Sequence, residues 1–178
     1  QILLAGSTYF VDTLRPTGSI ALSPASPLKA GAAQATLTLS KDAAAAPNLS
    51  FVGAASSTVT LSLAGGPRVW TATLAISTAT GEGTAVFLYN AVDTLGNSGA
   101  ALTAGASFFV DTVAPGPPLF AAAVSKPAGA IDLLWSAPSG EPPFSYALSR
   151  DGTRLPGFIA PNADKSGNFR DIPADGSH

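Results

Sequence analysis

The chain lacks cysteine and methionine, has one histidine and carries few charged residues. Without cysteine, a disulfide framework, a thiolate zinc site and a cysteine nucleophile are excluded. Charged residues are 11 % of the 178 positions, and the nine lysines and arginines form no cluster. The basic patch typical of nucleic-acid binding is therefore absent, so no nucleic-acid partner is expected. No apolar run reaches the length of about 18 residues that a membrane-spanning helix needs, so no membrane span is predicted.

What is present favours strands. Hydrophobic residues make up 46 % of the chain, many of them alanine, and the polar surface comes largely from Ser, Thr, Asn and Gly. The 18 glycines and 15 prolines are spread along the chain, which makes long helices improbable. Apolar residues alternate with Thr and Ser over 35–39, 59–63 and 70–76, as in half-buried strands. The four alanines before Pro47 are too few to nucleate a helix and are expected to form a loop. The predicted fold class is all-β.

One phrase occurs twice. Residues 5–16 and 104–115 share Ala-Gly, Phe-Val-Asp-Thr and a proline at the same positions, with an offset of 99 residues. That period is too long for a solenoid repeat and suits one small β domain. We therefore expect the phrase to mark the joint between successive modules.

This organisation predicts four segments. Residues 1–15 are expected to be the terminal strand of a preceding module, and 16–113 a complete β-sandwich of about seven strands, closed by a strand over 106–112. Residues 114–118 read as a Pro-rich linker. Residues 119–178 are expected to form a second, incomplete module in which Tyr146–Asp151 runs as a strand into an Asp-Gly turn.

The middle segment resembles a bacterial Ig-like repeat. The resemblance rests on the tryptophan strand at 68–74, the strand and Asp-x-x-Gly-Asn turn at 83–97, and the Phe-Val-Asp-Thr exit at 109–112. It covers about 16–113, with the tail of a preceding repeat at 1–13. It implies tandem immunoglobulin-like β-sandwiches.

Residues 116–178 resemble a truncated fibronectin type III domain. The pattern Ile-x-Leu-x-Trp at 131–135 is followed by a Pro-rich loop and by Tyr-x-Leu-x-Arg-Asp-Gly at 146–152. The resemblance implies that two further strands belong after residue 178. We therefore expect this segment to have an open edge and low stability when isolated.

Few residues suggest chemistry. His178 is the only histidine, and a chain end is a poor place for a triad or a metal site. A carboxylate pair for glycoside hydrolysis needs two facing acids across a cleft. The available acids are isolated in sequence: Asp12, Glu82, Asp93, Asp111 and Glu141. No catalytic, cofactor-binding or metal-binding residue is therefore assigned, no cofactor is expected, and the segment is predicted not to be an enzyme.

Two interpretations of the joint aspartates remain open. Asp12 and Asp111 lie at the joints, and Asp93 lies in an end loop with Asn97, so calcium bound between neighbouring modules is one interpretation. The other is that Asp93 and Asp111 cap turns by accepting hydrogen bonds from backbone N–H groups. The scarcity of carboxylates favours capping.

The remaining candidate residues have structural interpretations. Trp70 and Trp135 could stack on sugars, but each lies on the apolar face of an alternating strand and is expected to anchor a core. Asn48 begins an Asn-Leu-Ser glycosylation sequon that overlaps a predicted strand start, so it is discounted.

An odd number of antiparallel strands makes a chain enter a sandwich at one end and leave it at the other, so linked modules are expected to form a rod. The sequence therefore predicts a non-catalytic spacer or adhesion segment of a large secreted or cell-surface bacterial protein. Its partners would be neighbouring modules of the same chain and an unknown extracellular protein or glycan, or none. The alternative is an accessory linker region of a secreted polysaccharide-degrading or proteolytic enzyme whose catalytic domain lies elsewhere.

Overall fold

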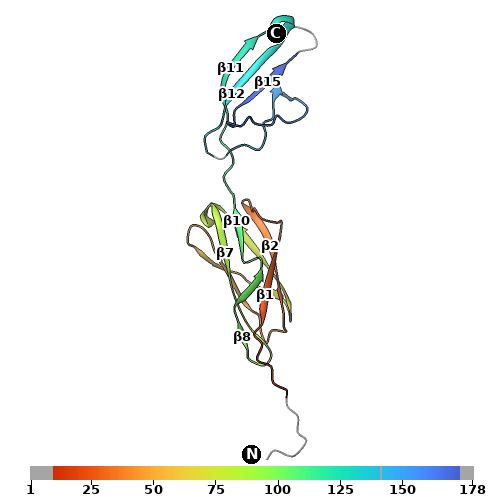
Figure 1. Ribbon diagram of the computed structural model, residues 1–178, viewed down its shortest axis with the longest axis vertical. Coiled ribbons are helices and arrows are strands. Elements are labelled where there is room, and N and C mark those ends of the chain that lie inside the picture. The colour runs from red at the N-terminus through yellow and green to blue at the C-terminus, as the bar shows by residue number, and fades with distance from the viewer. Residues whose placement is uncertain (1–9, 141, 173–178) are drawn as a thin grey trace, which may run out of the picture. The chain divides into compact units, whose positions relative to one another are not determined.

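The computed structural model describes residues 10–140 and 142–172 and divides at Thr112 into two units, residues 1–112 and 113–178 (Figure 1). The all-β prediction is confirmed. Among the described residues no α-helix occurs, and helical geometry is confined to two short 3₁₀ turns, Thr78–Thr80 and Pro127–Gly129. No helix in that part of the chain has the length and apolarity needed to cross a membrane.

The strands of the first unit follow one another at short intervals. Within the described residues they are β1 (Thr17–Ser23), β2 (Gly31–Leu39), β3 (Asn48–Val52), β4 (Thr58–Thr60), β5 (Ala64–Gly65), β6 (Val69–Ile76), β7 (Gly83–Val92), β8 (Ser98–Gly99), β9 (Ala101–Ala104) and β10 (Ser107–Val110). The Ala43–Pro47 stretch forms the expected loop and no helix.

These strands form two sheets. One has the order β5-β6-β2-β1-β9, and the other has the order β10-β7-β3-β4 with β8 beside β7. The period-two pattern explains the packing: in β2, Leu37 and Leu39 are buried while the intervening Thr38 is exposed. The buried side chains of both sheets form one hydrophobic core, whose largest fully buried member is Phe51.

The last strand of the first unit changes sheets. β9 pairs in parallel with β1, whereas β10 pairs antiparallel with β7 in the other sheet. Gly105 lies between them with a φ of 66°, and a Cβ there would lie 1.9 Å from the carbonyl oxygen of Ile20. Only glycine fits this close approach of two backbones. The closing strand predicted over 106–112 is thus the shorter β10, Ser107–Val110, and the chain changes sheets between β9 and β10 at a glycine of the repeated phrase.

The chain joins and leaves the first unit at opposite ends of the sandwich (Figure 1). β1 starts opposite the end of β2, with Gly18 across from Leu39, and Ala43 in the following loop bridges to Asp93 after β7. β10 finishes opposite the start of β7, with Val110 across from Gly83. We call residues 10–16 the lead-in segment and the end formed by loops 40–47 and 93–97 the lead-in end.

The second unit is smaller, and among its described residues only the apolar side chains of Ala130, Trp135, Pro143 and Tyr146 are buried. Its strands are β11 (Leu119–Ser125), β12 (Ile131–Ser136), β13 (Ser149–Arg150), β14 (Thr153–Arg154) and β15 (Gly167–Asp171). They form a sheet of order β11-β12-β15 and a separate β13-β14 hairpin. The hairpin turn predicted at Asp151-Gly152 is confirmed, with φ of 50° and 76°. The strand predicted from Tyr146 is largely absent, since Tyr146 makes only an isolated bridge to Ile159.

Several predictions about particular segments need correction or lie outside the structure. The terminal strand expected at 1–15 falls on residues 1–9, which are outside the described residues, and on residues 10–15, which form no strand. Trp135 is a core residue, as predicted, with 7 % of its surface exposed. Trp70 is only half-buried, because it packs at the margin of the core over Gly66.

Candidate functional site

The structure brings three of the sequence candidates together at the lead-in end of the first unit. Asp12 comes from the lead-in segment, while Asp93 and Asn97 come from the turn between β7 and β8. The Asn97 side-chain amide donates one hydrogen bond to the Asp12 carbonyl oxygen at 3.1 Å and another to Asp93 Oδ2 at 2.9 Å. One amide therefore ties the lead-in segment to a loop 85 residues away in the sequence.

Asp93 is the buried member of this cluster, with 3 % of its surface exposed. Its Oδ1 accepts hydrogen bonds from the backbone N–H groups of Leu95 at 3.0 Å and Asn97 at 2.8 Å. This is the geometry of a carboxylate that caps the turn following it. The cap predicted for Asp93 is confirmed.

Lys41 completes the cluster and was not among the residues singled out from the sequence. Its Nζ lies 2.7 Å from both carboxylate oxygens of Asp12 and 3.1 Å from Asp93 Oδ2, and it also donates to the carbonyl oxygen of Leu14. The only local signal is an isolated lysine directly after an alternating strand in a charge-poor chain. Because its partners are 29 and 52 residues away, no local pattern indicates the pairing.

The hydrogen bonds within the cluster favour the charged form of each of its ionisable groups. The hydrogen bond from the Asn97 side chain, with the backbone N–H bonds and Lys41, holds the pKa of Asp93 well below its usual range despite the desolvation of the carboxylate. The hydrogen bond from Lys41 likewise lowers the pKa of Asp12. Partial burial alone would lower the pKa of Lys41, but its hydrogen bonds to Asp12 and Asp93 outweigh that effect and raise it. All three groups are therefore charged at neutral pH.

Asp93→Asn should destabilise the first unit at pH 7 and weaken the loss of stability in acid. Because the pKa of Asp93 is depressed on folding, the carboxylate stabilises the fold above the unfolded value of about 3.9. Below that pH the unfolded chain binds more protons than the folded one, so stability falls as the pH falls. Thermal unfolding of both proteins between pH 7 and pH 2 measures this. The difference in melting temperature between the two proteins should become smaller below about pH 4.

Asp42→Asn is the matched control for that experiment. Asp42 lies beside Lys41 in sequence, but its side chain is 50 % exposed and pairs with Arg68, whose side chain is 57 % exposed. Solvent screening leaves little net stabilisation in such a pair. If Asp93→Asn and Asp42→Asn lowered the melting temperature equally at pH 7, Asp93 would not have this role. A difference in melting temperature between the parent protein and Asp93→Asn that stayed unchanged in acid would contradict the role as well.

The second copy of the repeated phrase is used differently. Among the described residues, the Asp111 carboxylate accepts no hydrogen bond and joins no ion pair, and the Asp111 backbone N–H donates to the carbonyl oxygen of Leu28. The cap predicted for Asp111 is therefore wrong. Instead Glu82 accepts from the backbone N–H of Thr112 at 3.0 Å and 3.1 Å and from the Thr112 hydroxyl.

The other chemical candidates form no site in the part of the chain that the structure describes. There, no three side chains of the His, Asp and Glu type lie close enough together to hold a metal ion. His178 and Glu141 are outside the described residues. Asn48 is the exposed first residue of β3, where its sequon overlaps a strand as expected.

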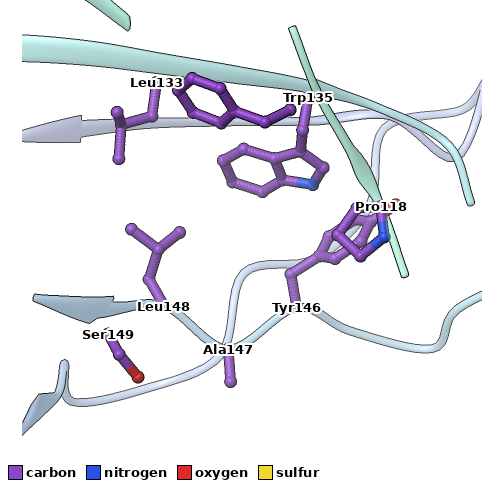
Figure 2. A pocket seen from close by; sticks show the side chains of 8 residues that line it. Pro118, Leu133, Trp135, Tyr146, Ala147, Leu148 and Ser149 are labelled. Atoms are coloured by element: carbon purple, nitrogen blue, oxygen red, sulfur yellow. The ribbon is translucent and has the colours of Figure 1, made fainter. Parts of the chain in front are cut away.

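The second unit contains an apolar groove of about 290 Å³. Figure 2 shows Leu133 and Trp135 of β12 on one side and Tyr146 and Leu148 on the other. Trp135 meets Tyr146 edge to face at a centroid distance of 5.2 Å. The Trp135 indole N–H is buried and has no hydrogen-bond partner among the described residues. The groove is lined mainly by carbon and provides no acid–base pair.

Comparison with known proteins gives no family for this chain. No protein-family model and no curated protein matches it. Among solved structures, it is similar to CopC from Methylosinus trichosporium OB3b, with 17 % identity, a TM-score of 0.38 and coverage of 55 % of this chain and 96 % of that one. It is also similar to a 1.5-MDa bacterial ice-binding adhesin, with 14 % identity, a TM-score of 0.38 and coverage of 89 % of this chain and 54 % of that one. Likenesses this weak carry no argument about function.

Proposed function

We propose that residues 10–112 form a non-catalytic spacer module of an extracellular or cell-surface bacterial protein, which transmits load between the segments that flank it. The observation that supports this most directly is that the chain joins and leaves the sandwich at opposite ends. A module of this kind lengthens a chain by a fixed step. The same geometry suits an adhesin, in which such modules carry a binding domain away from the surface.

The pairing of the first and last strands of the unit suits a load along that axis. β1, nearest the lead-in segment, pairs in parallel with β9, and β10 continues the same chain onto β7. A pull on the two ends of the module therefore loads several backbone hydrogen bonds together instead of opening them one at a time. The lead-in segment is also attached to the loops through Asp12, Lys41 and Asn97.

Single-molecule stretching tests the proposal. Because the chain has no cysteine, Phe10→Cys and Val113→Cys provide unique handles at exposed positions. We expect one unfolding event with a length gain of roughly 300 Å, since about 100 residues extend by about 3.4 Å each, less the folded length. The control pulls from Phe10→Cys and Leu95→Cys, which both lie at the lead-in end and should peel the structure at lower force. An equal or lower force along the 10–113 axis would contradict a load-bearing spacer.

A further inference from the structure

The lead-in segment is attached to the first unit through a cage of oxygen atoms with an ammonium group at its centre. The cage consists of the Asp12 carboxylate and the Leu14 carbonyl from the lead-in segment, and the Asp93 carboxylate from the unit itself. An ammonium has three N–H donors, and here they face four oxygens from three residues. The side chain of Lys41 is 21 % exposed, that of Asp12 is 20 % exposed and that of Asp93 is 3 % exposed.

A positive charge between the two carboxylates stabilises the attachment of the lead-in segment. The carboxylates of Asp12 and Asp93 both approach the same Nζ, so without a cation between them they would repel each other across the joint. Solvent screening is reduced because Asp93 is buried. Bonds between charged partners are also stronger than those between neutral ones. The Asn97 amide orients both acidic residues, because it donates to the Asp12 carbonyl and to the Asp93 carboxylate.

We propose that the Lys41 ammonium is the built-in cation of this joint and holds the lead-in segment on the first unit without any metal ion. Calcium takes six to eight oxygen ligands at about 2.3–2.6 Å. The cage offers Nζ four oxygens, and the ammonium occupies the position that a metal would need. This inference concerns the attachment of residues 10–16 and goes beyond the spacer role. The result of the stretching experiment therefore does not decide it.

Nitroxide mobility at Val11 tests the proposal in the full 178-residue chain. Val11 is 66 % exposed, and Val11→Cys is the only thiol in an otherwise cysteine-free protein. With Lys41 present we expect a restricted spectrum that is unchanged by millimolar CaCl₂ or by EDTA. Lys41→Met retains the length of the side chain and removes its charge, so it should mobilise the label. The population of detached lead-in segments should rise on the order of tenfold or more, as the loss of bonds to charged groups predicts.

Two further variants keep the result interpretable. Asp12→Asn changes only the lead-in side of the cage and should mobilise the Val11 label while the sandwich stays folded, as checked by circular dichroism. A label at exposed Ala21 in β1 should keep its spectrum in every background. A calcium- or EDTA-dependent spectrum in the parent protein would overturn the proposal. An immobile Val11 label in folded Lys41→Met or in Asp12→Asn would overturn it as well.

Discussion

Phe108→Ala should lower the free energy of unfolding of the first unit by about 3–5 kcal/mol, the range for removing a large aromatic side chain from a packed core. Phe108 is 3 % exposed and meets Phe87 and Phe51 at centroid distances of 5.0 Å and 5.5 Å. Small domains have a total stability of about 5–15 kcal/mol, so this loss is a large part of the whole. Urea denaturation followed through Trp70, in a Trp135→Phe background, measures it.

The neighbouring phenylalanine provides the control. Phe109 has the same side chain one position further along β10, but it points to the other side of the strand and is 50 % exposed. Phe109→Ala should therefore cost about 1 kcal/mol or less. Similar losses of unfolding free energy in Phe108→Ala and Phe109→Ala would contradict the assignment of Phe108 to the core between the sheets.

Gly105→Ala should lower the free energy of unfolding by about 2–4 kcal/mol. A φ of 66° costs a non-glycine residue about 1–2 kcal/mol, and the new Cβ would lie 1.9 Å from the Ile20 carbonyl oxygen, which forces β1 and the sheet switch apart. The same urea experiment measures the change. Loss of the contact between β1 and β9 should also appear as faster amide hydrogen exchange in β1.

Gly96→Ala separates the two contributions. Gly96 has a positive φ of 89°, but among the described residues no atom outside Gly96 and its two chain neighbours lies within 4 Å of the position that its Cβ would take. This variant should show the backbone penalty of about 1–2 kcal/mol alone. If Gly105→Ala cost no more than Gly96→Ala, the close approach to Ile20 would not constrain the sheet switch.

Much of the strand content could be predicted from the sequence because its causes are local. Alternating apolar residues in β2 and β6 expose one face and bury the other regardless of which strand lies beside them. The Asp151-Gly152 turn and the Asp93 cap likewise depend on residues within a few positions of each other. These predictions were correct. Trp70, predicted to anchor the core, packs against it but is only partly buried, since the depth of a side chain at the end of a strand depends on how far the facing sheet extends.

The two copies of the repeated phrase show what a local pattern does not determine. Asp12 and Asp111 lie in the same local sequence, Phe-Val-Asp-Thr, and sequence alone assigns them the same role. In the structure Asp12 binds Lys41, whereas the backbone of Thr112, next to Asp111, binds Glu82. The difference comes from the loops packed beside each copy, which are 29 and 30 residues away in the chain.

The sequence by itself therefore determined the all-β class, the alternation of buried and exposed side chains and the chemistry of individual turns, because these follow from bonds and contacts between near neighbours. Only the tertiary structure decided the order of the strands, the change of sheet at Gly105 and the gathering of Asp12, Lys41 and Asp93. Each of these depends on residues far apart in the chain. Their approach is set by how the two sheets share one core, and no local pattern encodes it.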